Sequence, residues 1–377
     1  MPIITCVEDL RKLHRKRAPR PFFEYVDCGS YTEGTYRANS ADLAALKLRQ
    51  RVGINVADRS TESVMVGQKV TMPVAIAPTG LAGMQWADGE ILAARAAERF
   101  GIPYTLPVMS VCSIEEVAAA TTKPFWFQTY GMRDREFFWR LIGRAKAANC
   151  SALVITLDVP ALGQRHRDVI NGLNVPPRLT PSGLLALAAK PIWGLRMLRA
   201  KRWVFGNVVG HVKGVTNVTS VGYWASHQFD STMDWKELER IRREWTGKLI
   251  LKGILDPDDA RKAVAVGADA IVVSNHGGRQ LDGALSSIKA LPPIADAVGD
   301  KVEVWMDGGI RSGQDVIKAL AMEAKGTMIG RAFNYGLGAM GEAGVTATLE
   351  IIRKELDVSM ALCGVRKIAE IGRQVIV

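Results

Sequence analysis

The chain has 377 residues, 48% of them hydrophobic, and its 49 Lys and Arg against 38 Asp and Glu give a formal net charge of +11. This composition excludes a disordered, collagen-like or coiled-coil protein and is sufficient for a large buried core. The positive charge suits an anionic small molecule, an acidic membrane surface or a nucleic acid, and alone it does not choose among them.

The five cysteines, Cys6, Cys28, Cys112, Cys150 and Cys363, are widely scattered and include no C-x-x-C pair. This spacing predicts neither a disulfide framework nor a zinc site, so we expect no bound metal and a reducing, cytoplasmic environment. The basic N-terminus is not followed by the apolar stretch of a secretory signal, and no uncharged apolar run of about 18 residues predicts a membrane-spanning helix.

Residues 1–72 come before any repeating pattern, and we expect them to form a helical cap over one end of the fold. From residue 73 onward, short apolar runs rich in β-branched residues alternate with segments of helical period. The eight runs, which we predict to be strands, span 73–80, 104–109, 124–130, 152–158, 249–253, 270–278, 302–309 and 326–333. Most are almost wholly apolar, which is typical of parallel strands buried on both faces.

Helical segments lie between these strands, at 89–100, 135–148, 235–245, 256–267 and 312–324. Asp256-Pro257 and Ser312 are typical of helix N-termini. Eight strand-then-helix units in series predict an α/β fold, a closed (β/α)8 TIM barrel. An open doubly wound sheet is the alternative, but the eight units and the absence of a G-x-G-x-x-G motif after the first strand count against it.

We expect 1–377 to form a single domain, with the barrel over 73–356 and a C-terminal tail over 357–377. The connection after the fourth strand, 159–233, is far longer than an ordinary strand-to-helix loop, so we treat it as an insertion.

The centre of this insertion, 178–215, contains no acidic residue. Its basic residues are Arg178, Lys190, Arg196, Arg199, Lys201, Arg202 and Lys213. Between them lie Leu184, Leu185, Leu187, Ile192, Trp193, Leu195, Met197, Leu198, Trp203, Val204 and Phe205. Cationic residues mixed with Trp, Leu and Phe predict a segment that lies in a membrane interface. A mobile surface loop, or a lid packed on the barrel mouth, is the alternative.

Catalytic groups of a parallel barrel lie at the carboxyl ends of its strands. In this chain those ends carry Pro78-Thr79-Gly80, Met109, Gln128, Tyr130, Thr156, Asp158, Lys252, residues 274–279, Asp307-Gly308-Gly309 and Gly330-Arg331. A full ring of ionisable and hydrogen-bonding residues is difficult to explain as packing, so it predicts an active site at this end.

The ends of the last two strands are typical of a phosphate site. Gly308 and Gly309 would let backbone N–H groups approach an anion closely, while Arg311 and Arg331 supply positive charge and bidentate donors. Barrels often bind phosphate at this position. The alternative is a pair of tight turns with incidental arginines.

His276 and Arg279 indicate acid–base chemistry on a carboxylate substrate. Arg279 can bind a carboxylate through two parallel hydrogen bonds while His276 removes a proton from the neighbouring carbon or hydroxyl. Asp158, on another strand end, could orient the imidazole and stabilise its positive charge. We expect the other histidines, His14, His166, His211 and His227, to be structural.

The sequence S-N-H-G-G-R-Q-L-D at 274–282 resembles the signature of the FMN-dependent L-2-hydroxy acid dehydrogenase/oxidase family. The resemblance covers almost the whole chain, from F-F-E-Y-V-D-C-G-S at 22–30 to A-L-C-G-V-R-K-I-A-E-I at 361–371. Within the family, the chain looks most like the bacterial, membrane-associated enzymes that oxidise L-lactate.

The resemblance implies FMN as the cofactor, with His276 as the active-site base and Asp158 as its carboxylate partner. It implies that Arg279 and Arg165 bind the substrate carboxylate, helped by the hydroxyls of Tyr25 and Tyr130. Met109 and Gly80 would line the pocket for the substrate side chain.

The same resemblance implies a set of FMN contacts. Lys252 would lie beside the flavin N1–C2 carbonyl and stabilise negative charge on the reduced ring. The ring and ribityl chain would contact Pro78, Thr79, Gly80, Gln128, Thr156 and Ser274. The ribityl–phosphate end would be held by Asp307, Gly308, Gly309, Arg311, Gly330 and Arg331.

Together these features predict oxidation of an (S)-2-hydroxy acid, with L-lactate as first choice, to the 2-oxo acid, with electrons passed to a quinone or other respiratory acceptor. An oxidase releasing hydrogen peroxide and a mandelate-type dehydrogenase are the alternatives. We expect peripheral contact with the inner face of the cell membrane through 178–215. The resemblance also implies a homo-oligomer, a tetramer.

Two other classes of function fit less well. A barrel without flavin could use Lys252 to form a Schiff base with a carbonyl substrate, as an aldolase does. Nucleic-acid binding is suggested only by the basic composition. Outside 178–215 the basic residues are mixed with acids and no recognised binding motif occurs, so we expect no nucleic-acid partner.

Overall fold

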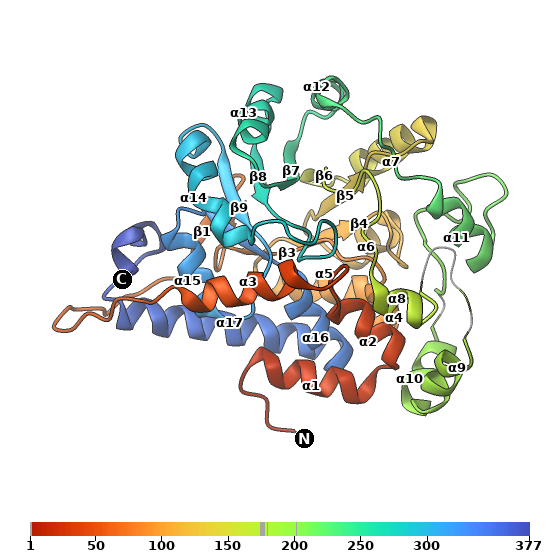
Figure 1. Cartoon of the computed structure of the whole chain (residues 1–377), viewed down its shortest axis with the longest axis horizontal. Helices are drawn as coiled ribbons and strands as arrows, with labels where there is room; N and C mark the ends of the chain where they lie inside the picture. The colour runs from red at the N-terminus through yellow and green to blue at the C-terminus, as the bar shows by residue number, and fades with distance from the viewer. Residues whose placement is uncertain (1, 174–177, 179, 201) are drawn as a thin grey trace.

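The computed structural model describes residues 2–173, 178, 180–200 and 202–377 and consists of a barrel of strands surrounded by helices (Figure 1). The barrel strands are β3 (Val74–Ile76), β4 (Thr105–Pro107), β5 (Trp126–Tyr130), β6 (Ala152–Thr156), β7 (Lys248–Ile254), β8 (Ala270–Val273), β9 (Glu303–Met306) and β10 (Gly326–Ile329). They are parallel and pair in the order β3-β10-β9-β8-β7-β6-β5-β4. A bridge between Ile76 and Tyr104 joins the first strand to the last, so the predicted (β/α)8 barrel is confirmed.

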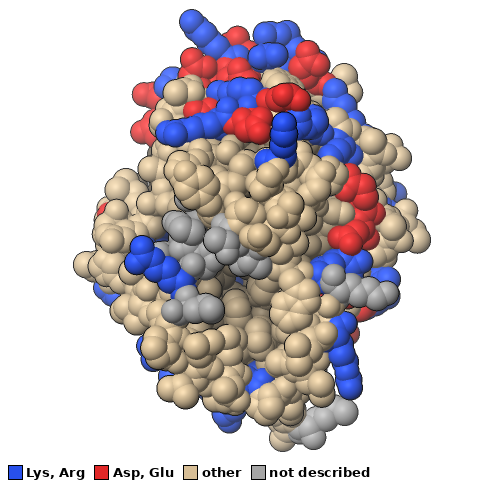
Figure 2. All heavy atoms as spheres, turned by 90° about the vertical axis from the view of Figure 1, so that its right-hand side faces the viewer, with Lys and Arg blue, Asp and Glu red and all other residues tan. Residues whose placement is uncertain are grey.

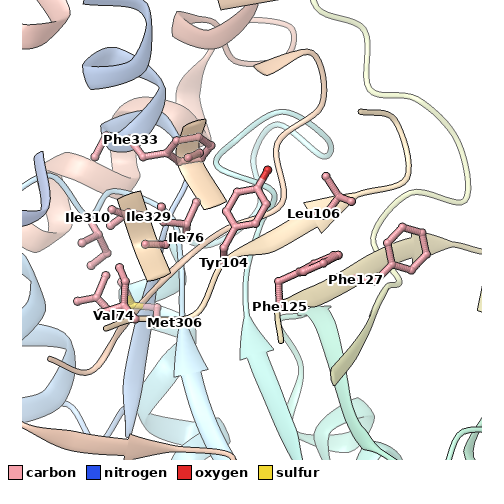
Figure 3. Packing of buried hydrophobic residues seen from close by; sticks show 14 of the residues in the cluster. Val74, Ile76, Tyr104, Leu106, Phe125, Phe127, Met306, Ile310, Ile329 and Phe333 are labelled. Carbon is pink, nitrogen blue, oxygen red and sulfur yellow. The ribbon is translucent and has the colours of Figure 1, made fainter. Parts of the chain in front are cut away.

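Alternation of side chains explains why the strand sequences are apolar throughout. Ala152 and Val154 of β6 point into the barrel, whereas Leu153 and Ile155 point outward against the helices. Both directions are buried, because the helices cover the outside of the barrel and side chains fill the inside. Figure 3 shows part of the outer layer, around β3, β4 and β5.

Two indole rings fill much of the barrel interior near the amino ends of the strands. Trp126 of β5 and Trp305 of β9 stack with ring centroids 5.3 Å apart and planes 8° apart. Both side chains are fully buried. The interior is therefore packed solid below the carboxyl ends, and the space for a ligand lies above this layer.

The helices on the outside of the barrel are α5 (Gly89–Phe100), α6 (Ile114–Ala120), α7 (Arg135–Ala147), α12 (Trp235–Glu244), α13 (Pro257–Val266), α14 (Ser287–Val298), α15 (Gly313–Ala321), α16 (Arg331–Met340) and α17 (Glu342–Leu362), with a short α4 (Ala82–Gln85). The predicted N-caps are confirmed. The Asp256 side chain accepts a hydrogen bond from the backbone N–H of Asp258, and the Ser312 hydroxyl accepts one from that of Asp315.

The N-terminal segment, expected to form a helical cap, contains helices and also a β-hairpin. It contains α1 (Val7–Arg17), α2 (Arg20–Asp27) and α3 (Gly34–Ala45), followed by a hairpin of β1 (Ser63–Met65) and β2 (Gln68–Val70). Helices α2 and α3 contact the carboxyl end, through bonds such as that between Asn39 and Asn275. The hairpin covers the opposite end, where the Val66 N–H donates to Glu303 at the start of β9.

The conformation of the hairpin turn explains why the hairpin was not predicted from the sequence. Val66 and Gly67 have φ of +41° and +82°, the left-handed conformation that tight hairpin turns require. A β-branched residue is rare in that conformation, so a Val-Gly pair is not a recognisable turn signal.

The C-terminal boundary that we expected after residue 356 falls inside α17, which continues to Leu362. Beyond it, the short helices η1 (Ile368–Glu370) and η2 (Arg373–Val375) lie beside the segment after α3. The Arg49 N–H donates to the Val375 carbonyl, and the Val377 N–H donates to that of Lys47. The last residues of the chain are thus tied to the segment after α3, and the division of 1–377 into cap, barrel and tail stays a prediction.

In its described residues, the insertion 159–233 forms four short helices beside the barrel mouth (Figure 1): α8 (His166–Ile170), α9 (Pro181–Ala188), α10 (Pro191–Leu198) and α11 (Val218–Ser226). After α10, Arg202 pairs with Asp88 at 2.6 Å and Glu116 at 2.5 Å. The buried Asn207 side chain donates to the Val108 carbonyl and accepts from the Ile114 N–H. This part of the insertion is packed on the barrel as a lid would be. Lys201 lies outside the described residues.

Candidate functional site

A cavity of about 710 Å³ lies at the carboxyl end of the barrel. The predicted site residues that line it are Tyr25, Pro78, Thr79, Gly80, Met109, Tyr130, Arg165, Lys252, His276, Arg279, Asp307, Gly308, Gly309, Arg311, Gly330 and Arg331. The other predicted residues, Gln128, Thr156, Asp158 and Ser274, are at the same strand ends, bonded to each other or to lining residues. The Gln128 amide, for example, donates to the Thr156 hydroxyl at 3.0 Å.

Strand alternation brings these residues together. On β6, the positions that point inward continue from Ala152 and Val154 to Thr156 and then Asp158. Thr156 pairs in register with Lys252 of β7, so the two lie side by side at the barrel end. The alternation that buries small apolar side chains deep in the barrel therefore also places polar side chains at its mouth.

The turn after β8 presents the imidazole. His276, Gly277 and Gly278 have φ of +58°, +66° and +71°, three consecutive left-handed residues. A Cβ at Gly278 would lie 2.4 Å from the backbone nitrogen of Tyr36, so only glycine lets α3 approach this turn. A left-handed histidine is strained, and such strain is commonly found at functional sites.

The imidazole of His276 is held by a carboxylate. Its Nδ1 lies 2.9 Å from Asp158 Oδ1, which leaves Nε2 for the cavity. Burial opposes ionisation of Asp158, but the charges of His276 and Lys252 outweigh burial and hold its pKa below the ordinary value. Asp158 is therefore an anion that stabilises a protonated imidazole.

Space for this carboxylate comes from a bulge in β7. The pairing of β7 with β8 shifts between Lys252 and Ile254, and Gly253 between them has φ of +102°. A Cβ at Gly253 would lie 2.6 Å from Asp158 Cγ. Bulges commonly re-aim side chains beside active sites. We did not identify Gly253 from the sequence, although a glycine inside an apolar strand is a signal for a bulge.

Lys252 keeps a buried positive charge in the cavity wall. Its Nζ lies 2.9 Å from Asp307 and donates to the Ser274 hydroxyl at 2.8 Å. Burial lowers the pKa of Lys252, but Asp307 and Asp158 raise it by more, so the net shift is upward.

Two guanidinium groups frame the side of the cavity next to Tyr25. The Cζ atom of Arg279 lies 4.8 Å from the centroid of the Tyr25 ring, and that of Arg165 lies 6.0 Å from the same centroid. Arg279 Nη1 donates to the Tyr25 carbonyl at 2.6 Å, and Arg165 Nε pairs with Asp168 at 2.5 Å. These bonds hold both cations in place. The hydroxyl of Tyr130, whose pKa burial raises, stays protonated and can donate to an anion.

The expected phosphate end has a glycine cradle and clustered cations. Gly308 and Gly309 have φ of +90° and +94°, and a Cβ at Gly309 would lie 2.6 Å from the Asn39 carbonyl. Arg331 donates to the backbone carbonyls of Val26, Gly277 and Cys28. Burial lowers the pKa of Arg331, and the charges of Arg279 and Arg311 lower it further. A dianion would relieve this repulsion.

The side chains fit FMN at both ends of the cavity. Gln128 Oε1, Asp307 Oδ1 and Asn334 Oδ1 are buried acceptors without a hydrogen-bond partner in the structure, as expected where a ligand supplies donors. The cationic end suits a phosphate. Within the described residues, no group of three or more His, Cys, Asp or Glu side chains could hold a metal ion.

Sequence reasoning missed residues that support the predicted ones. Asn334 lines the cavity and donates to the Thr79 hydroxyl at 2.8 Å. It follows Arg331 by three residues on α16, a spacing that puts both on one helix face and could have identified it. Asn39 and Asn275 exchange side-chain hydrogen bonds of 2.9 and 2.8 Å, but nothing in the sequence connects positions so far apart.

Comparisons with known proteins identify the family of the chain. The chain matches the family described as FMN-dependent dehydrogenase over residues 14–377. It is 49% identical over 376 residues to an L-lactate dehydrogenase of Azorhizobium caulinodans, with 100% of this chain and 99% of that protein covered. It is similar to the crystal structure of the monotopic membrane protein (S)-mandelate dehydrogenase, with a TM-score of 0.94, 32% identity and full coverage of both chains. A mandelate oxidase structure with (S)-4-hydroxymandelic acid matches with a TM-score of 0.84 and 35% identity over 97% of each chain. The chain belongs to the FMN-dependent dehydrogenase family.

Proposed function

We propose that the chain oxidises L-lactate, as the first choice among (S)-2-hydroxy acids, to the 2-oxo acid with FMN as the cofactor. The observation that carries the proposal is the His276–Asp158 pair, which faces the same cavity as Arg279 and Arg165. Such a cavity can bind a carboxylate and remove a proton from the carbon or hydroxyl next to it.

Each residue has a part in this chemistry. Arg279 and Arg165 bind the substrate carboxylate, and the hydroxyls of Tyr25 and Tyr130 orient it. His276 takes a proton from the substrate, and anionic Asp158 stabilises the imidazolium that results. When bound, FMN accepts the two electrons that the substrate loses.

FMN would be held along one wall of the cavity. Lys252 would place its positive charge beside the ring system, with Gln128, Thr156 and Ser274 as hydrogen-bonding partners. The glycines 308 and 309 and the guanidinium of Arg311 would receive the phosphate. Arg331, three of whose N–H groups donate to backbone carbonyls, would act through its charge and by fixing α2.

L-lactate is preferred because the 49% identical relative is an L-lactate dehydrogenase. A mandelate-type acid is the second candidate. Its support is Gly80, which lines the cavity beside Met109 and Tyr25 and adds no side chain to it.

The charge of Lys252 argues against an aldolase-type Schiff base. A lysine must be neutral to attack a carbonyl carbon, and sites that use one depress its pKa. The neighbours of Lys252 raise its pKa instead.

We also propose that helices α9 and α10 rest on a membrane surface. Leu184, Leu185, Ile192, Leu195 and Leu198 expose between 50% and 77% of their surface. Figure 2 shows this side of the molecule, whose lower part, over α9 and α10, is mostly uncharged with scattered Lys and Arg. This surface supports the proposal of peripheral contact with the inner face of the cell membrane and of a respiratory acceptor. None of the helices in the described part of the chain is long and apolar enough to span a membrane. The tetramer stays a prediction.

One experiment tests the proposed oxidation. The visible spectrum of the purified protein should be that of a flavin, and anaerobic L-lactate should bleach it faster than glycolate or (S)-mandelate does. Slow return of the colour on admission of air would indicate a dehydrogenase, and fast return with hydrogen peroxide an oxidase. Failure of all three acids to bleach bound flavin would contradict the proposal.

A further inference from the structure

Two loops at the cavity mouth are held together by a buried carboxyl group. The loop after β3 brings Gly80 and Leu81 to the cavity, and the loop after β4 brings Met109 and Val111. Glu90, in the first turn of α5, is fully buried and does not line the cavity in the described structure. Any effect that it has on the reaction must therefore pass through the loops.

One oxygen atom of Glu90 connects the two loops. Its Oε1 accepts a hydrogen bond from the Gly83 N–H at 2.9 Å and another from the Val111 N–H at 3.1 Å. The loops also meet directly, because the Leu81 N–H donates to the Met109 carbonyl at 3.2 Å. A buried N–H group that loses its acceptor is costly, so Glu90 fixes both loops relative to α5.

The packing around this carboxyl group leaves the loops little freedom. A Cβ at Gly83 would lie 2.7 Å from Val111 Cβ and 2.9 Å from Glu90 Oε2, so only glycine lets the loops approach this closely. From the insertion, the buried Asn207 amide donates to the Ser110 hydroxyl at 2.9 Å. The loop after β4 is thus held by both α5 and the insertion.

The same loops carry residues proposed to lie beside the substrate. A Cβ at Gly80 would lie 3.2 Å from the Met109 carbonyl and 3.3 Å from the hydroxyl of Tyr25. That hydroxyl is proposed to orient the substrate carboxylate, so a shift of either loop would change the space next to the bound acid. A pocket distinguishes side chains only while its walls keep their positions.

We propose that Glu90 is a positioning residue that sets the preference among 2-hydroxy acids by fixing the loops after β3 and β4. The inference rests on the proposed function and deepens it. Burial of Glu90 outweighs the hydrogen bonds that it accepts and raises its pKa, which favours a neutral carboxyl group. A neutral amide should therefore replace it, because a glutamine oxygen can accept the same two hydrogen bonds.

Four variants test this role. E90L removes the acceptor at a similar side-chain size, whereas E90Q keeps an acceptor oxygen. G83A leaves the carboxyl group in place and separates the loops by a methyl group. E98L is the matched control, because Glu98 is on the same helix and accepts from the backbone N–H groups of Thr122 at 2.7 Å and Lys123 at 2.6 Å. None of these three residues lines the cavity in the described part of the chain.

The readout is the kcat/KM of the flavin-loaded protein for L-lactate divided by that for (S)-mandelate. This ratio does not depend on the amount of active protein, so a general loss of stability does not change it. E90L and G83A should reduce the preference for the better acid at least about fivefold, since one methylene in a pocket is worth about tenfold or more in selectivity. E90Q and E98L should keep the preference within about twofold, because both retain the hydrogen bonds to the two loops.

The proposal depends on E90L when that variant retains flavin, and on G83A when it does not. An unchanged preference in the deciding variant would leave Glu90 a purely structural role and overturn the proposal. A loss in E90Q or E98L as large as that in E90L would also overturn it, since the acceptor oxygen would not be the cause. So would equal kcat/KM values for the two acids in the unmodified protein. Bound flavin that neither acid bleaches would instead reject the proposed function.

Discussion

His276 is fixed from two directions, by Asp158 at its Nδ1 and by the Ser274 hydroxyl at its backbone N–H. The first bond sets which ring nitrogen faces the cavity, and the second stabilises the left-handed turn. Asp158 does not line the cavity in the described structure, so it acts on the reaction through the imidazole.

The first prediction concerns this imidazole. H276A should slow anaerobic flavin reduction by substrate about 100- to 10,000-fold, which is the usual contribution of a general base. Bound FMN should remain, because the residues proposed to hold it are elsewhere. Stopped-flow bleaching measures the rate, and H211A, at an exposed surface histidine, is the control. Near-normal bleaching by H276A would remove the base from the mechanism.

The second prediction concerns His14, which is fully buried on α1 and hydrogen-bonded to Gln85 at 3.0 Å. Burial lowers its pKa from 6.5 to about 4. Between these values the unfolded chain binds a proton that the folded protein does not, so the free energy of unfolding falls as the pH falls. This loss of unfolding free energy begins near pH 6.5 and is complete by about pH 4, and it amounts to about 3 kcal/mol.

H14Q should therefore lose less stability than the unmodified protein between pH 6.5 and pH 4. Denaturant unfolding at several pH values measures the difference in slope. The exposed His166 provides the control variant H166Q, which should keep the unmodified slope. A slope unchanged in H14Q would show that another group causes the acid sensitivity.

At the scale of elements, the bulge in β7 gives the third prediction. G253A should destabilise the protein by roughly 1–3 kcal/mol for the left-handed backbone, and it should also displace Asp158. A displacement of about 1 Å near the reacting groups can cost on the order of a hundredfold in rate, so flavin reduction should slow by about that factor.

Gly67 offers a matched control for this substitution. Its φ of +82° is similarly left-handed, but a Cβ there would meet nothing within 4 Å. G67A should lower stability by a similar amount and leave flavin reduction unchanged. If both variants slowed flavin reduction equally, the effect would come from stability and not from Asp158.

The elements also show how far the sequence alone could lead. The eight strands were predictable because burial on both faces makes each run apolar, and Asp256 and Ser312 mark helix starts through their own side chains. The hairpin of β1 and β2 was not predictable, because its Val66-Gly67 turn lacks the residues that are usual in tight hairpin turns. In the site, strand-end residues such as Thr156 could be placed by alternation and His276 by its motif. The exchange between Asn39 and Asn275 depends on tertiary contacts that no local pattern encodes.

For the whole molecule, the exposed leucines of the insertion give the fourth prediction. The triple variant L184E/I192E/L195E should move the protein from the membrane pellet to the supernatant. Burying one such side chain in lipid is worth roughly 1.5–3 kcal/mol, so together they should lower partitioning by a hundredfold or more. Dye-linked oxidation of the hydroxy acid should persist, because these residues do not line the cavity. Unchanged sedimentation would contradict the membrane surface.

Deleting 178–215 is a poorer test of the same surface. The deletion removes Asn207, whose buried amide donates to the Val108 carbonyl and the Ser110 hydroxyl at the end of β4. It also removes Trp193 and Met197 from the cavity wall. Loss of activity in such a deletion would therefore reflect an opened barrel end and would say nothing about the membrane.

The stacked indoles inside the barrel come from β5 and β9, which β6, β7 and β8 separate in the sheet. They can meet only when the sheet has curled far enough to bring its distant parts face to face. Two parallel indoles at this separation couple their ultraviolet transitions, so the pair should produce an exciton couplet in circular dichroism. This couplet would report when the barrel closes during refolding, even in protein from which the flavin has been removed. W126F should abolish the couplet.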